Sequence, residues 1–275
     1  EMLIIKEFEK NYTSEKAIWW YTREACFYRM INKALRVQNF DMLFAFRFFI
    51  TDIAKEIKAD YDKLIRTVDT SKKIVVYRGQ TIGTDELKLV RKSVGEFLSM
   101  NSFLSTSRNR SVALNFARQT PLTSGFAHII FEIEIDPRLQ TKAFADIKGK
   151  SFFGNDEDEV LITLGALFRI EEVKKNESNQ IWTVRVSLAS EDDFHLKETF
   201  AFMKETIGDD TDLNSLGKIL HEMGEYEQSR KYFERMRRDL ELKMGDCYLG
   251  LGKAQEQQSQ TDSALAHYKK ALQIR

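Results

Sequence analysis

The stretch Gly154-Asn155-Asp156-Glu157-Asp158-Glu159-Val160-Leu161-Ile162 is the most informative part of this 275-residue sequence. A loop runs into four consecutive acids and then into an apolar run that predicts a strand. If the strand begins by Glu157, the side chains of Glu157 and Glu159 point to the same face. Such a pair can divide two tasks, one carboxylate acting as a base and the other stabilising positive charge. A solvated acidic turn gives the same pattern, so the stretch needs support from elsewhere.

Two segments upstream offer that support. Val75-Val76-Tyr77-Arg78-Gly79 predicts a buried strand that ends in an arginine, whose planar guanidinium can hold a pyrophosphate, and a glycine that lets the backbone approach a flat ligand. Phe103-Leu104-Ser105-Thr106-Ser107 predicts a strand whose hydroxyls can bond a sugar or orient another side chain. The alternatives are a plain turn after Arg78 and a helix cap at Ser107 or Asn109.

Around these segments the hydrophobic period changes twice. Residues 13–66 have apolar side chains every three or four positions and predict helices, with Ser14 and either Asn39 or Asp41 as caps. This region is rich in aromatic residues, which favours a helical subdomain packed on the rest of the domain over a ligand cage.

Residues 73–188 change to the period of strands. The strands are expected at 74–77, 96–100, 102–106, 128–135, 159–163, 167–173 and 181–188, with one short helix near 109–118. Because no strand-helix-strand unit repeats, a doubly wound parallel sheet is disfavoured. We expect an α+β domain with two small, mainly antiparallel sheets and helices outside.

Composition narrows the function. Lys plus Arg and Asp plus Glu each total 42, so the net charge of zero offers no general attraction to nucleic acid or to an anionic membrane. Cys26 and Cys247 lie far apart and the four histidines are scattered, which predicts neither a disulfide framework, nor a metal site, nor a Ser-His-Asp or Cys-His mechanism. No signal peptide or long apolar span is evident, so we expect a cytoplasmic location.

Together, and in this order, Arg78, Ser105 and the Glu157-Asp158-Glu159 triplet resemble the arginine-serine-ExE signature of the arginine-specific mono-ADP-ribosyltransferases, the cholera-toxin-like branch. About 27 residues separate Arg78 from Ser105 and about 50 more lead to Glu157. Residues 18–24 and 28–36 also look like this branch, so the resemblance covers roughly residues 10–190. It implies the ADP-ribosyltransferase fold, with NAD as co-substrate in a cleft between two sheets and no metal.

The resemblance implies a role for each motif residue. Arg78 would hold the diphosphate, and the backbone of Gly79 would meet the nicotinamide amide. Ser105 would bond the nicotinamide ribose and position Glu159, the carboxylate that stabilises positive charge as nicotinamide leaves. The neighbouring Tyr77 and Thr106 and, on the following helix, Phe116 are further candidates for contact with the cofactor.

On the acceptor side, the resemblance gives Glu157 the task of binding the guanidinium of an arginine and accepting its proton. Family members with Gln at this place modify other residue types, so Glu157 argues for arginine. Phe152 and Phe153, just before the ExE triplet, lie in a loop that in the family helps recognise the protein substrate.

The chain after residue 190 predicts a second architecture. A polar break at 191–193, a connecting helix at 195–206 and a loop at 208–212 lead into residues 213–275, which resemble tetratricopeptide repeats offset by 35 residues. Gly217 and Gly252 would be the points where paired helices cross closely. Because such arrays need three or more repeats, we expect the natural array to be longer. A plain helical hairpin is the alternative.

The sequence thus divides into a transferase domain at 1–190, with helical residues 1–70 and an NAD-binding β core at 71–190, a connector at 191–212 and repeats at 213–275. The leading hypothesis is ADP-ribosylation of arginine on a protein target, with a protein or peptide partner for the repeats and neither nucleic acid nor membrane as partner. The alternatives are an NAD glycohydrolase, in which water replaces the acceptor, and a repeat-based adaptor with an inactive transferase domain.

Overall fold

A computed structural model describes residues 2–23, 26–121, 123–152, 154, 158–176, 180–190, 197–198, 205 and 212–274. The contacts divide the chain into two compact units, 1–193 and 194–275, and each is described by itself. Two predicted site residues, Phe153 and Glu157, lie outside the described residues, as does most of the connecting helix expected at 195–206.

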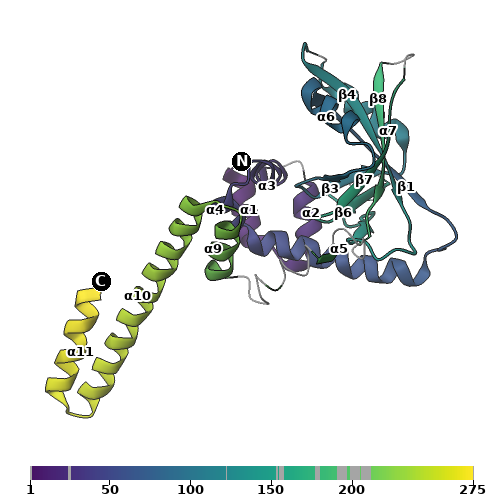
Figure 1. The fold of residues 1–275 in the computed structure, drawn as a ribbon. Coiled ribbons are helices and arrows are strands. Elements are labelled where there is room, and N and C mark those ends of the chain that lie inside the picture. Colours follow the sequence, from purple (N-terminus) through teal and green to yellow (C-terminus); the bar gives the residue numbers. More distant parts are fainter. Residues whose placement is uncertain are drawn as a thin grey trace. The chain divides into compact units, whose positions relative to one another are not determined.

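The first unit begins with a group of helices. They are α1 (Met2–Asn11), a 3-10 turn (Ser14–Lys16), α2 (Ala17–Thr22), α3 (Cys26–Arg36), α4 (Phe40–Ala45) and α5 (Arg47–Thr67), as Figure 1 shows. The predicted helical period is confirmed, because its described apolar positions are buried or partly buried, with Ile18, Ile31, Phe49, Ile53 and Ile57 fully buried.

The aromatic residues of these helices pack on one another. The Phe8 ring lies 5.2 Å from Trp20, 4.4 Å from Phe27 and 5.5 Å from Phe49, measured between centroids. Offset and edge-on rings at such distances are typical of a core. The expectation of a packed subdomain rather than a ligand cage is confirmed. Helix α1 was not predicted from the sequence; Phe8 is the one buried side chain among those described in it.

Eight strands follow. They are β1 (Ile74–Gly83), β2 (Phe97–Ser99), β3 (Leu104–Ser107), β4 (Phe126–Ile135), β5 (Phe144–Asp146), β6 (Glu159–Ile162), β7 (Leu167–Asn176) and β8 (Ile181–Leu188). Their order is β2-β7-β8-β4-β1-β3-β6-β5, and the pairs are antiparallel except β4 with β8. β1 pairs with β4 over its whole length but with β3 only at Tyr77↔Ser107. The two predicted sheets are therefore joined through a single residue pair.

Three elements differ from the expectation. β1 does not end at Arg78, because residues 80–83 continue its pairing with residues 126–129 of β4. A second helix, α6 (Thr84–Lys92), interrupts the strands and buries Leu87 and Val90. The short strand β5 was not predicted either, since three residues are too few to show a period.

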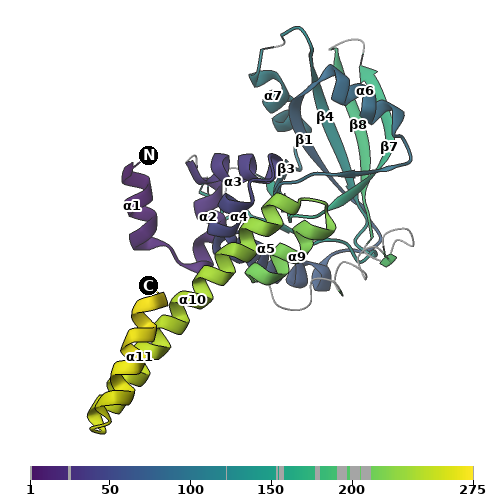
Figure 2. The same ribbon diagram turned by 60° about the vertical axis from the view of Figure 1, so that its left-hand side comes forward.

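The predicted helix near 109–118 is α7 (Arg110–Gln119). Asn109 caps it, its side-chain oxygen accepting a hydrogen bond from the Ser111 N–H at 2.9 Å. Both α6 and α7 pack on the central strands β1 and β4 (Figure 2), whereas α5 packs on β5, the last strand of the order.

The second unit contains α9 (Leu213–Glu222), α10 (Tyr226–Gln257) and α11 (Thr261–Ile274). A Cβ added at Gly217 would lie 2.8 Å from the Phe233 ring, and one at Gly252 would lie 2.5 Å from the Tyr268 ring. The predicted close crossings at both glycines are confirmed. None of the helices in the described ranges is long and apolar enough to cross a membrane, and the cytoplasmic location stays a prediction.

Candidate active site

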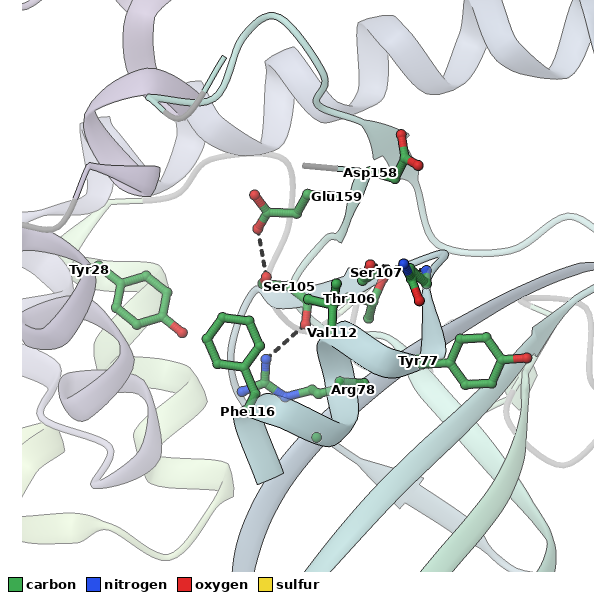
Figure 3. A pocket seen from close by; sticks show the side chains of 13 residues that line it. Tyr28, Tyr77, Arg78, Ser105, Thr106, Ser107, Val112, Phe116, Asp158 and Glu159 are labelled. Atoms are coloured by element: carbon green, nitrogen blue, oxygen red, sulfur yellow. Dashed lines mark hydrogen bonds between the residues drawn. The ribbon is translucent and has the colours of Figure 1, made fainter. Parts of the chain in front are cut away.

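Three predicted site residues lie together because β3 runs between β1 and β6. The Ser105 hydroxyl donates to Glu159 Oε1 at 2.6 Å, and Arg78 Nη1 donates to the Ser105 carbonyl oxygen at 2.8 Å. Figure 3 shows this chain of contacts from Glu159 through Ser105 to Arg78. The strand register, with Ser107 opposite both Tyr77 and Glu159, brings together residues that are 27 and 54 positions apart in sequence.

A second contact fixes the plane of the Arg78 guanidinium. The Arg78 Nε donates to Oε1 of Gln80 at 3.3 Å. Gln80 is two residues after Arg78 on β1, so both side chains lie on the same face of the strand. A guanidinium has five N–H donors, so these two contacts orient the group and leave further donors for an anion. Gln80 was not predicted from the sequence, because its contact with Arg78 depends on the continuation of β1 past Arg78.

The three residues line a cavity of about 450 Å³. Phe116, half exposed on α7, and Tyr28 of α3 both line this cavity and are labelled in Figure 3. Phe116 was predicted from the sequence, but Tyr28 was not, because its place in the helical period predicts a core position. The lining residues are Tyr28, Tyr77, Arg78, Gly79, Ser105, Thr106, Ser107, Asn109, Val112, Ala113, Phe116, Asp158 and Glu159.

A second cavity, of about 700 Å³, shares Tyr28 and Arg78 with the first. Its wall carries three more cations from α3, Arg29, Lys33 and Arg36, against one carboxylate from α6. Arg78 therefore lines both cavities. The first cavity contains the Glu159 carboxylate, and the second has more cationic than anionic side chains. This layout fits a dinucleotide, whose two halves are joined by a diphosphate at the middle.

Gly79 has a packing role that the sequence did not reveal. A Cβ at this position would lie 1.7 Å from the Ala113 carbonyl oxygen and 2.8 Å from the Ala117 nitrogen. Since these are backbone atoms of α7, only glycine allows the helix to lie this close to β1. This close approach sets the position of Phe116 at the cleft. The contact predicted between Gly79 and the nicotinamide amide stays a prediction.

Two other proposed cofactor contacts, Tyr77 and Thr106, line the cavity but are turned differently from the central residues. Thr106 is buried, and its hydroxyl donates to the Val160 carbonyl oxygen at 2.7 Å, which ties β3 to β6. The Tyr77 ring points away from Ser105 and Glu159 in Figure 3, as expected where successive strand residues alternate. Their cofactor contacts stay predictions.

Tyr21, fully buried, lies next to the site. Burial raises its pKa well above the ordinary tyrosine value, so the phenol is neutral. The Asn32 amide donates to its hydroxyl at 3.0 Å, and its ring lies 5.4 Å from Phe103 and 5.2 Å from Tyr28. Tyr21 thus packs against Tyr28 and against Phe103, the residue directly before β3. Within the described part of the chain, no group of three or more His, Cys, Asp or Glu residues is placed to hold a metal ion.

Phe152, proposed to contact the protein substrate, lies on the surface with 42% of its area exposed and is not among the residues that line the cavity. Its backbone N–H donates to Thr22 Oγ1 at 2.8 Å, and its ring lies 5.3 Å from Trp19. These contacts join it to α2. Recognition of a protein by Phe152 stays a prediction.

The strand order and the site formed by β1, β3 and β6 are those expected of an enzyme that uses NAD to transfer ADP-ribose. The sequence profile of the ADP-ribosyltransferase exoenzymes matches residues 4–189, and the chain belongs to this family. A tetratricopeptide-repeat profile matches residues 209–275. No curated protein sequence matches the chain.

Several solved structures are similar to about two thirds of this chain. The Vis toxin of Vibrio splendidus is 19% identical, over 69% of this chain and 84% of that one, with a TM-score of 0.45. HopU1 of Pseudomonas syringae pv. tomato DC3000 is 21% identical, over 67% and 80%, with a TM-score of 0.49. The C3 exoenzyme of Clostridium limosum is 21% identical, over 67% and 90%, with a TM-score of 0.45.

Proposed function

We propose that this protein transfers ADP-ribose from NAD to arginine side chains of a protein target and releases nicotinamide. The observation that carries the proposal is the hydrogen bond from Ser105 to Glu159 at the edge of a cavity that also contains Arg78. The family membership supports the NAD-dependent transfer of ADP-ribose. Arginine as the acceptor is a proposal that goes beyond the family membership.

Cleavage of NAD needs an anion where positive charge develops. As the bond between nicotinamide and the ribose breaks, the ribose carbon becomes an oxocarbenium-like centre, and a preplaced carboxylate stabilises it. Glu159 is the candidate for this carboxylate. Ser105 orients it through the 2.6 Å hydrogen bond, and Arg78 would hold the diphosphate at the junction of the two cavities.

Transfer needs a second carboxylate on the acceptor side. A protonated guanidinium is a poor nucleophile, so a base that takes its proton as its nitrogen bonds the ribose carbon promotes the attack. Glu157, two residues before Glu159, is the candidate by sequence. The proton of the guanidinium passes to Glu157, and nicotinamide leaves with the electrons of the broken bond.

The repeats of the second unit are proposed to bind a protein or peptide, either the target of modification or a regulator. Helical repeats present extended surfaces for such partners. The exposed apolar side chains of α10 and α11, which include Leu240, Leu251 and Leu272, are available for such contacts.

The test is to supply NAD labelled in its ADP-ribose part, with and without agmatine as a small guanidino acceptor. We expect label to move to agmatine, and mass spectrometry of proteins treated with the wild type but not with Glu159→Gln to find the label on arginine. Release of free ADP-ribose that agmatine does not redirect would instead support an NAD glycohydrolase.

A further inference from the structure

The residues just before the ExE triplet form a compact turn of their own. We call residues 147–152 the acceptor-side segment. The N–H groups of Lys150 and Ser151 both donate to the Ile147 carbonyl oxygen at 3.0 Å, and the Ile147 N–H donates to the carbonyl oxygen of Glu159 at 3.1 Å. Ile147 and Ser151 are buried. A turn that is bonded internally moves as a unit, so contacts at its surface set its position.

Helix α2 contacts one end of this segment. Thr22, the last residue of α2, accepts the hydrogen bond from the Phe152 N–H at 2.8 Å. The Arg23 guanidinium lies 5.6 Å from the Phe152 ring and 5.4 Å from the Trp19 ring, within cation–π distance of both, and forms an ion pair with Glu7 of α1 at 3.0 Å. The contact therefore combines a hydrogen bond, an edge-to-face ring pair and a guanidinium that is paired with a carboxylate of α1.

Helix α5 contacts the middle of the segment. Lys150 Nζ lies 2.5 Å from an Asp60 carboxylate oxygen and 3.8 Å from one of Glu56. The side chains of Asp60 and Glu56 are only 17% and 13% exposed, so solvent screens this attraction less than it screens a surface ion pair. Glu56 also accepts a hydrogen bond from the Ile18 N–H at 3.2 Å and so joins α2 to α5.

These contacts lie outside the cavity that holds Arg78, Ser105 and Glu159, because none of Thr22, Lys150 and Phe152 lines it. We propose that α2 and α5 hold the acceptor-side segment where transfer requires it, with Thr22 and Lys150 as positioning residues that act on transfer and not on cleavage of NAD. The inference rests on the proposed function, in which Glu157 is the acceptor-side base, because the segment directly precedes the stretch that carries Glu157.

Thr22→Val tests the contact with α2. Valine keeps the shape of threonine but cannot accept the Phe152 N–H. Thr67→Val is a matched control, because Thr67 also ends a helix with its hydroxyl bonded to carbonyls of the preceding turn, as Thr22 does, yet it lies in α5. Thr22→Ser restores the hydroxyl and should restore the wild-type behaviour.

For the full chain, we expect Thr22→Val to lower kcat/KM for agmatine by about threefold to tenfold, the usual range for one hydrogen bond, through a higher KM for the acceptor. The KM for NAD and the rate of NAD hydrolysis without acceptor should stay at the wild-type values. Hydrogen exchange of a peptide covering residues 147–152 should become faster in Thr22→Val and not in Thr22→Ser or Thr67→Val.

Lys150→Met tests the contact with α5, with Lys58→Met as its control. Lys58 pairs with Asp62 on α5 at 2.7 Å and contacts nothing in the segment. We expect Lys150→Met to give the same split between transfer and hydrolysis, and Lys58→Met to give none.

Each contrary outcome has a distinct meaning. Unchanged hydrogen exchange in Thr22→Val, or equal changes in transfer and hydrolysis, would overturn the positioning role while the wild type still modifies agmatine. A wild type that cleaves NAD but transfers nothing to agmatine would overturn the proposed acceptor, and with it the role of the segment.

Discussion

The two sides of the candidate site are built by different means. On the strand side, Arg78, Ser105 and Glu159 come from β1, β3 and β6, and backbone pairing fixes their relative positions. On the acceptor side, residues 147–152 are held by side chains from α2 and α5. The positions of the strand residues change only if the strand pairing changes. The side-chain contacts of residues 147–152 with α2 and α5 can be changed by single substitutions.

This difference separates the two halves of the reaction. Cleavage of NAD depends on a carboxylate placed to within a fraction of an ångström, which a paired strand provides. In the proposed function, the choice of acceptor depends on a segment whose side-chain contacts with α2 and α5 can vary without changing the strand register. A protein built in this way can keep its cleavage chemistry while the target changes.

The sharpest test of the strand side is Glu159→Gln. Glutamine keeps the shape and can still accept from Ser105, but it removes the negative charge that stabilises the transition state. We expect nicotinamide release to fall by about 10²- to 10³-fold or more, with the Kd for NAD within about threefold of the wild type. Chromatographic assay of nicotinamide and calorimetric titration with NAD measure the two quantities. Near-normal turnover would show that another group stabilises the charge.

On the acceptor side, the corresponding variant is Glu157→Gln. Because it removes the proposed base but no charge from the cleavage step, we expect transfer to agmatine to fall by about 10²-fold. NAD hydrolysis without acceptor should fall by much less. The ratio of the two rates, measured with one labelled NAD stock, is the readout. Equal losses would assign Glu157 to cleavage and remove the distinction between the two sides.

Gly79→Ala tests whether the stability of the strand side depends on the close approach of α7 to β1. A Cβ at residue 79 would overlap the Ala113 carbonyl of α7, whereas one at Gly83, on the same strand, meets nothing within 4 Å. We expect Gly79→Ala to lower the free energy of unfolding by about 1–3 kcal/mol or more. Gly83→Ala should change it by much less. Urea unfolding of both variants gives the comparison, and equal losses would contradict the close approach of α7.

The strand side was also the more predictable from sequence. Ser105 and Glu159 stand in short apolar runs whose period reveals strands, and the Arg78, Ser105 and Glu159 positions of the motif indeed meet. The extension of β1 and the contact of Arg78 with Gln80 escaped prediction because they depend on which strand pairs with residues 80–83. Tyr28 escaped for a related reason, since one helical period contains both core residues and residues at the rim of a cleft.

The acceptor side could not be predicted in the same way. Phe152 and Lys150 carry no periodic signal, and their partners, Thr22 and Asp60, are 130 and 90 residues away in sequence. Side-chain contacts over such separations depend on how α5 packs on β5, which no local pattern encodes. The interpretation of Phe152 as a residue of the loop was accessible from sequence, and its contact with α2 was not.

The smallest expected effect is the pH dependence of stability that Glu56 causes. Glu56 lies on α5, near Lys150 of the acceptor-side segment. Burial is the main cause that raises the pKa of Glu56 above the ordinary glutamate value, while its hydrogen bond from Ile18 and the charge of Lys150 act in the opposite direction. Between the ordinary pKa and the raised one, the folded protein binds more protons than the unfolded chain. Stability therefore falls as the pH rises through this window, and above it the ionised carboxylate costs stability.

Glu56→Gln should remove this dependence, because an amide oxygen can still accept from Ile18 and does not titrate. We expect the change in Tm between pH 4.5 and pH 7 to be smaller in Glu56→Gln than in the wild type. Asp62→Asn, which removes a half-exposed carboxylate from the same helix, should leave that change nearly as it is. If the slope persists in Glu56→Gln, the pH dependence belongs to another group. If it disappears together with part of the transfer activity, Glu56 joins Lys150 as a contact through which α5 holds the acceptor side.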